Sequence, residues 1–193
     1  MRPRLVLFGD SITEQSFASG GWGAALAEHF ARQVLDRAME GAADGGADPA
    51  AVTVFFGAND ATLPDQSQAH LNNKWPSAAV ILITPPPIHE PARIRQPERT
   101  NEVVGTYAQA CIAVAKELGH PVIDIWTLMQ QFPDWQTSAL SDGLHFTPSG
   151  NKILFDEVLK TLESVGFSQH SLRSDLPLFH EIDPKDPLKA FEI

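Results

Sequence analysis

Four short apolar runs, each rich in β-branched or aromatic residues, constrain the fold of this chain more than any other feature. They lie at residues 5–8, 52–56, 80–84 and 122–125. None of them alternates between apolar and polar residues, which is typical of strands that are covered on both faces of a parallel sheet. The runs therefore predict four buried strands in a mostly parallel sheet.

Amphipathic helical patterns separate these runs. They cover residues 24–40, 98–118 and 148–165, with Thr147 as the candidate N-cap of the last helix and Gly119 as the C-cap of the second. In the second helix the predicted buried stripe consists of Val103, Val104, Tyr107, Cys111, Val114 and Leu118. Strands that alternate with helices predict an α/β layer fold. In such sheets ligands bind beyond the carboxyl ends of the strands, so a functional residue should follow a strand.

The size and charge of the chain limit its class. With 193 residues it fits one domain, for which we predict a body of residues 1–167 and an extended C-terminal arm of residues 168–193. The net charge is −10 and no basic cluster stands out, which disfavours nucleic acid as a partner. No apolar stretch is long enough for a signal peptide or a membrane span, and the single cysteine, Cys111, cannot form an internal disulfide. A cytoplasmic protein is the expectation, with Cys111 either a buried apolar residue or a catalytic thiol.

A serine follows the first apolar run, in the segment Gly9-Asp10-Ser11-Ile12-Thr13. Its hydroxyl is expected at the carboxyl edge of the sheet, where it needs a base to become a nucleophile. Ser11 is therefore a candidate catalytic residue. The alternative interpretation makes Ser11 or Thr13 the N-cap of the next helix, which is common in loops between strand and helix.

A candidate base lies in the segment Asp142-Gly143-Leu144-His145, downstream of the fourth run. His145 is able to take the proton of Ser11 and return it to a leaving alcohol, while Asp142 accepts the other ring N–H and fixes the tautomer. Of the seven histidines, only His145 has, three residues before it, an acid that is itself followed by glycine. The spacing of the histidines predicts no metal site.

An amide donor follows the second run, in the segment Gly57-Ala58-Asn59-Asp60. The side chain of Asn59 is a candidate donor to the negatively charged oxygen of a tetrahedral intermediate. The alternative interpretation is an asparagine that closes an Asx-turn.

Together these three motifs resemble those of the SGNH (GDSL) hydrolase family, in which they recur in the same order. Further segments resemble the isoamyl acetate-hydrolysing esterase homologues within that family: Gly20-Gly21-Trp22-Gly23, Ile83-Thr84-Pro85-Pro86-Pro87 and Asp183-Pro184-Lys185-Asp186-Pro187-Leu188. The resemblance covers nearly every segment of the chain. It implies a flavodoxin-like three-layer α/β/α fold and hydrolysis of short acyl esters without a cofactor. It also implies a triad of Ser11, His145 and Asp142, and an oxyanion hole that includes the Ser11 N–H.

The same resemblance implies that parts of the family pattern are missing. Members carry a second strand between the serine and asparagine motifs, followed by a glycine that supplies the middle oxyanion donor. Here the helical pattern of residues 24–40 leads through a glycine-rich segment directly into residues 52–56. We therefore expect this strand and donor to be absent, and the first strand to become an apolar edge. Further shortening is expected at residues 66–74 and 93–97. Our hypothesis for all three gaps is alternative splicing, or a gene model that lacks exons.

The loop before the histidine motif contains Phe132, Trp135 and Leu140, which either line a substrate pocket or pack the loop. The predicted function is a carboxylic ester hydrolase for small acyl esters, with a part in lipid metabolism. Two alternatives stay open. One is an inactive or poorly folded shortened variant that acts only through binding, and the other is an acyltransferase.

Overall fold

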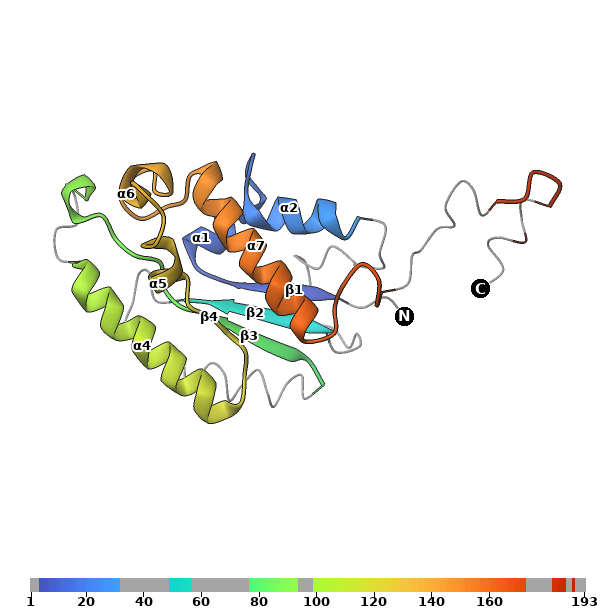
Figure 1. The fold of residues 1–193 in the computed structure, drawn as a ribbon, viewed down its shortest axis with the longest axis horizontal. Helices are drawn as coiled ribbons and strands as arrows, with labels where there is room; N and C mark the ends of the chain where they lie inside the picture. Colours follow the sequence, from blue (N-terminus) through green and yellow to red (C-terminus); the bar gives the residue numbers. More distant parts are fainter. Residues whose placement is uncertain are drawn as a thin grey trace.

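The computed structural model describes residues 4–31, 49–56, 77–93, 99–172, 182–186 and 189. Within these residues four strands form one parallel sheet, whose strand order follows the chain (Figure 1). The strands are β1 (Leu5–Gly9), β2 (Ala51–Phe55), β3 (Ala79–Ile83) and β4 (Val122–Ile123). The helices are α1 (Ser11–Glu14), α2 (Trp22–His29), α4 (Asn101–Leu118), α5 (Ile125–Met129), α6 (Trp135–Ser138) and α7 (Pro148–Ser164), with 3₁₀ turns η1 (Gln15–Phe17) and η2 (Glu90–Ala92).

All four predicted strands are confirmed, and one of them is shorter than predicted. Strand β4 ends at Ile123, and Ile125 already belongs to helix α5. The reason is Asp124, whose carboxylate accepts a hydrogen bond from the backbone N–H of Thr127 at 3.1 Å and so caps the helix. A short apolar run does not by itself distinguish a strand from the first turn of a buried helix.

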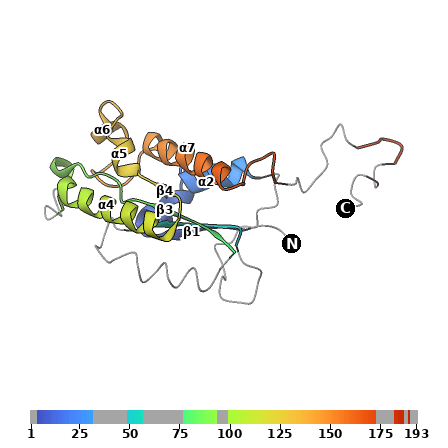
Figure 2. The ribbon, with the colours of Figure 1, turned by 60° about the horizontal axis from the view of Figure 1, so that its bottom comes forward.

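The sheet lies between two layers of helices, as predicted from the resemblance (Figures 1 and 2). Alternate strand residues point to opposite faces. On one face Phe55 and Ile81 belong to a core cluster with residues of α2 and α7, and Leu5 packs against this cluster. On the other face Val52 and Val80 pack against α4. The chain therefore has the three-layer α/β/α architecture.

Helix α4 presents a different stripe to the sheet from the one predicted. Its buried residues are Val104, Gly105, Ala108, Cys111 and Ala115. Val103 is 47% exposed, and Tyr107 and Leu118 are also exposed, so their predicted burial is wrong. The buried stripe consists mainly of small residues, and larger apolar residues beside it are exposed. The predicted C-cap is confirmed, since Gly119 has a φ of +70°.

The last predicted helix is confirmed as α7, and its cap is Thr147, whose hydroxyl accepts a hydrogen bond from the N–H of Gly150 at 3.2 Å. Leu154, Val158 and Leu162 of this helix are buried. Helix α2, in contrast, ends at His29, with Phe30 as its C-cap, before the end of the predicted helical pattern at residue 40. The pattern from residue 32 to residue 40 lies outside the described part of the chain.

The edge position of β1 agrees with the prediction, because in the described residues β1 pairs only with β2. No strand of the described part lies between α2 and β2 in the chain. The three predicted gaps themselves fall in residues outside the described ranges, apart from Arg93. The start of the predicted C-terminal arm packs on the body, where Leu172 joins the core and Gln169 donates to the carbonyl of His29 at 2.8 Å. The boundary at residue 167 remains a prediction.

Candidate active site

Ser11 lies where strand β1 ends, as the first residue of helix α1. The cap of this helix is Asp10, whose carboxylate accepts from the N–H of Ile12 at 3.2 Å. Gly9 permits the turn, because a Cβ at this position would lie 2.5 Å from the carbonyl oxygen of Phe55. The interpretation of Ser11 or Thr13 as the cap is therefore wrong. The Ser11 hydroxyl is left to contact another part of the chain.

That contact is His145. The Oγ of Ser11 lies 3.2 Å from Nε2 of His145, although the two residues are 134 positions apart in the chain. The other ring nitrogen of His145, Nδ1, lies 2.9 Å from Oδ2 of Asp142. The structure thus brings together in one hydrogen-bond chain the three residues that the motifs singled out.

Hydrogen bonds within the loop that carries Asp142 and His145 stabilise its conformation. Oδ1 of Asp142 accepts from the backbone N–H groups of Leu144 at 3.0 Å and His145 at 2.8 Å. Burial alone raises the pKa of the Asp142 carboxyl, but the hydrogen bonds from His145 and Leu144 lower it by more, and the net pKa is below its ordinary value. Asp142 is therefore ionised when it faces the imidazole.

Gly143 allows this loop to turn, with a φ of +82°. It also packs against the segment that precedes η2, since its carbonyl accepts from the N–H of His89 at 3.0 Å. A Cβ at Gly143 would lie 2.5 Å from the carbonyl oxygen of His89. Two loops that lie far apart in the chain, one at His89 and one at Gly143, are thus in direct backbone contact next to Asp142.

Sequence reasoning missed Arg93, which contacts the same aspartate. Its guanidinium donates to Oδ2 of Asp142 at 3.2 Å, and its side chain is 11% exposed. Arg93 lies ten residues after β3, in a segment with no recognisable motif. No pattern in the sequence pairs it with an aspartate 49 residues further on.

The predicted substrate-binding residues differ in how far they are buried. Leu140 is 3% exposed and forms an isolated β-bridge with Phe146, so it belongs to the core beneath the loop. Trp135 is partly buried and packs against the same core. Phe132 is 43% exposed. Their role in binding stays a prediction.

A cavity in the described structure is lined by residues of the two segments that follow Ser11 and His145 in the chain. Its lining comes from the α1–η1 segment and from the start of α7: Ile12, Gln15, Ala18, Ser19, Gly21, Phe146, Pro148 and Asn151. Ile12 and Phe146 directly follow the candidate nucleophile and the candidate base. None of the three predicted pocket residues lines this cavity.

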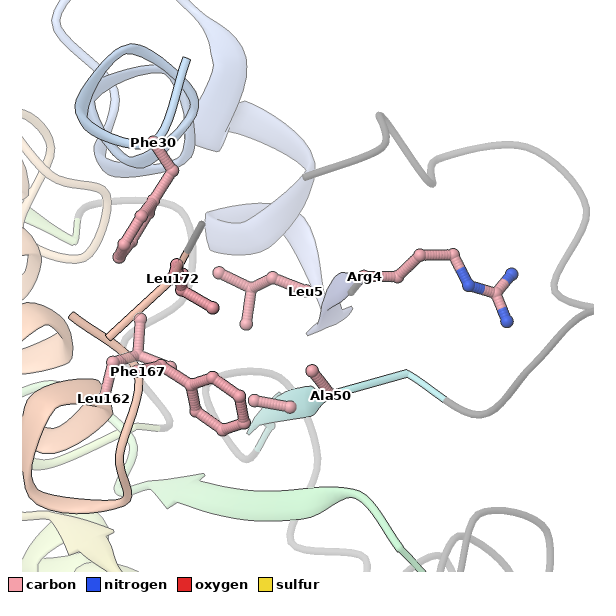
Figure 3. Close-up of a pocket in the computed structure, with 8 residues that line it drawn as sticks. Arg4, Leu5, Phe30, Ala50, Leu162, Phe167 and Leu172 are labelled. Atoms are coloured by element: carbon pink, nitrogen blue, oxygen red, sulfur yellow. The ribbon is translucent and has the colours of Figure 1, made fainter. Parts of the chain in front are cut away.

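A second, apolar cavity lies at the opposite end of the sheet (Figure 3). Leu5 and Ala50 line it near the starts of β1 and β2, together with Phe30, Leu162, Phe167 and Leu172 from the helical layer and the C-terminal segment. Strand β1 spans five residues between this cavity and the turn before Ser11, a length of about 16 Å. The cavity is therefore remote from the candidate nucleophile.

Two further candidate functional residues were named from the sequence, Asn59 and Cys111. Asn59 lies outside the described residues, so its place relative to Ser11 is not part of the structure. Cys111 is buried in α4, and burial, followed by the charge of Asp124, raises the pKa of its thiol to about 11. A thiol with that pKa is a poor nucleophile near neutral pH, which supports the buried structural role.

Among the described residues no cluster of three or more His, Cys, Asp or Glu is arranged to hold a metal ion, and no helix is long and apolar enough to cross a membrane.

The fold and the candidate site together define a parallel α/β/α protein with a Ser–His–Asp hydrogen-bond chain at the carboxyl edge of its sheet, an arrangement able to carry out nucleophilic hydrolysis. Comparison with known proteins agrees with this class. The model of the GDSL-like lipase/acylhydrolase family matches residues 7–153. The chain belongs to this family.

Relatives span the whole chain. A GDSL esterase/lipase of Arabidopsis thaliana is 47% identical, and the match covers 100% of this chain and 99% of the relative. The human isoamyl acetate-hydrolyzing esterase 1 homolog is 39% identical over 96% of this chain and 90% of its own length. The match to the Arabidopsis relative runs over 238 positions, whereas this chain has 193 residues, so the relative carries residues that have no counterpart here. This difference agrees with the predicted internal shortening.

Solved structures support the fold. A lipase/acylhydrolase from Enterococcus faecalis superposes with a TM-score of 0.66 at 23% identity, covering 91% of this chain and 100% of that one. An SGNH hydrolase from Slackia heliotrinireducens gives 0.65 at 17% identity, covering 84% of this chain and 100% of that chain. These neighbours have the flavodoxin-like arrangement expected from the sequence.

Proposed function

We propose that the chain is a carboxylic ester hydrolase for small acyl esters, with Ser11 as nucleophile, His145 as general base and Asp142 as the residue that orients His145. The observation that carries the proposal is the hydrogen-bond chain from the Ser11 hydroxyl through both ring nitrogens of His145 to Asp142. Its distances are within the range in which a base activates a hydroxyl.

In the proposed reaction, Nε2 of His145 accepts the proton of Ser11 as Oγ attacks the ester carbonyl. The protonated imidazole then donates that proton to the leaving alcohol, which leaves an acyl group on Ser11. Water attacks this acyl-enzyme with His145 again as base, and the carboxylate of Asp142 stabilises each imidazolium. No cofactor takes part in these steps.

The proposed oxyanion hole has two donors. The N–H of Ser11 is in the first turn of α1, where helix N–H groups have no acceptor within the helix. The Asn59 amide is the second donor in the proposal. The family resemblance implies a third donor, the backbone N–H of a glycine that we expect to be absent from this chain. Loss of one donor typically lowers turnover on the order of a hundred- to a thousandfold, so we expect slower turnover than in relatives that carry this glycine.

Small esters are proposed as substrates because of the family and because the human relative carries the name of an isoamyl acetate-hydrolyzing esterase. The cavity beside Ile12 and Phe146 is proposed to receive one part of the ester. The sequence-based proposals of Phe132, Trp135 and Leu140 as pocket residues and of a cytoplasmic location stand beside it as predictions.

Hydrolysis of p-nitrophenyl acetate tests the proposal. Ser11→Ala should lower the rate of the purified protein at least about a hundredfold. The control is Ser164→Ala, an exposed serine at the end of α7, which should leave the rate unchanged. Equal rates for wild type and Ser11→Ala would reject the proposal. Transfer of the acetyl group to an added alcohol, with little release of acetate, would favour the acyltransferase instead.

A further inference from the structure

The carboxylate of Asp142 has its acceptor positions filled by four donors. Oδ1 takes the backbone N–H groups of Leu144 and His145, at 3.0 and 2.8 Å. Oδ2 takes Nδ1 of His145 at 2.9 Å and Nη1 of Arg93 at 3.2 Å. An ionised carboxylate offers about four lone-pair sites, so Arg93 occupies the one that the histidine loop leaves open.

The guanidinium of Arg93 is held more firmly than an ordinary surface cation. Its side chain is 11% exposed, whereas that of Asp142 is 48% exposed. The segment before it is tied to helix α4, because Glu90 Oε1 accepts from the N–H of Asn101 at 2.6 Å and Asn101 Oδ1 accepts from the N–H of Ile88 at 3.0 Å. The N–H of Arg93 itself donates to the carbonyl of Glu90 at 2.9 Å. A buried guanidinium on an anchored segment is a rigid partner for a carboxylate.

We propose that Arg93 is a positioning residue that fixes the orientation of the Asp142 carboxylate and, through it, the ring of His145. The inference deepens the proposed function and rests on it. Asp142 is nearly half exposed, so without Arg93 water competes for Oδ2 and the carboxylate is able to rotate away from Nδ1. The imidazole then samples orientations in which Nε2 does not face Ser11. The rate of the chemical step falls, while the binding of the ester changes little.

The kinetic test compares Arg93→Ala with wild type on p-nitrophenyl acetate. The expected result is a fall in kcat of about tenfold, with KM changed by less than about twofold. The fall is smaller than the roughly hundredfold loss that a 1 Å misplacement of the reacting groups causes, because the His145 ring is displaced only part of the time. Millimolar guanidinium should restore kcat in Arg93→Ala, because the deleted group leaves a space of its own shape. It should not restore kcat in Arg93→Met, in which the new side chain fills that space. The control is Lys152→Met, which removes an exposed cation that lies 2.8 Å from Asp156 and should leave kcat unchanged.

A readout independent of activity is the NMR signal of the proton on Nδ1 of His145, in protein labelled with ¹⁵N-histidine. Arg93→Ala should move or broaden this signal, and guanidinium should return it to the wild-type position. Wild-type kcat in Arg93→Ala, or a lowered kcat with an unchanged Nδ1 proton and no rescue, would overturn the proposal. If Ser11→Ala retained full activity, the proposed function would fall. In that case the Nδ1 signal would still decide whether Arg93 positions the Asp142–His145 pair.

Discussion

Replacing Gly143 with alanine perturbs the loop between Asp142 and His145 without changing either side chain. Gly143 has a φ of +82°, and the new Cβ would lie 2.5 Å from the carbonyl oxygen of His89. To reach a contact of 3.0 to 3.4 Å, the two loops must separate by roughly 0.5 to 0.9 Å. The same backbone carries Asp142 and His145, so the hydrogen bond to Ser11 is displaced by a comparable amount.

Gly119 offers a matched control for this substitution. It has a φ of +70°, and a Cβ there would meet no atom within 4 Å. Gly119→Ala therefore adds only the strain of a left-handed residue, about 1–2 kcal/mol. For a chain of this size we expect Tm to fall by about 2–8 °C, with the esterase rate unchanged.

Gly143→Ala adds the steric contact to the same strain. We expect kcat/KM for p-nitrophenyl acetate to fall on the order of a hundredfold, because catalysis is sensitive to misplacement of about 1 Å. Both variants should be measured by thermal unfolding and by steady-state kinetics at a temperature at which each is folded. The reasoning is refuted if Gly143→Ala keeps wild-type kcat/KM, or if Gly119→Ala loses as much activity as Gly143→Ala.

Three further predictions concern stability and reactivity. Because the folded pKa of Asp142 lies below its ordinary value of 3.8, the stability it contributes is present above that pH and is lost as the pH falls through the folded pKa. The difference in free energy of unfolding between wild type and Asp142→Asn should thus shrink as the pH falls below 3.8. Cys111, with its thiol pKa raised to about 11, should resist alkylation by iodoacetamide at pH 8 in the folded protein and react in urea. A fast reaction without urea would contradict its burial. Leu154→Ala removes a fully buried side chain of α7 and should lower the free energy of unfolding in urea by about 2–5 kcal/mol. A loss below about 1 kcal/mol would show that α7 is not packed as described.

The parts of the fold that follow from local chemistry were predictable from the sequence. Caps at Thr147 and Gly119 depend on one side chain or one backbone angle, and both are present. Strands β1 to β3 follow from short apolar runs that end in glycine or proline-rich turns. Strand β4 was predicted too long because Asp124 caps a helix one residue later.

The parts that depend on packing between distant segments were not predictable. In α4 the small residues Ala108 and Ala115 are buried, although hydrophobicity alone favoured Val103 and Tyr107. In the candidate site, too, local motifs were predictable and a contact between distant segments was not. The motifs identified Ser11 and His145, whereas the contact of Arg93 with Asp142 arises only when two loops meet. A single sequence contains no signal for such a pair.

Covalent labelling with a fluorophosphonate tests the central claim most directly, since it requires an activated serine in a folded chain. We predict one phosphonyl adduct on the wild-type protein, located on Ser11 by peptide mass spectrometry and absent from Ser11→Ala and from urea-unfolded protein. His145→Gln should label far more slowly, because Nε2 no longer takes the proton of Ser11. Absence of an adduct on folded wild-type protein, or labelling of Ser11→Ala at the same rate, would contradict the assignment of Ser11 as the nucleophile.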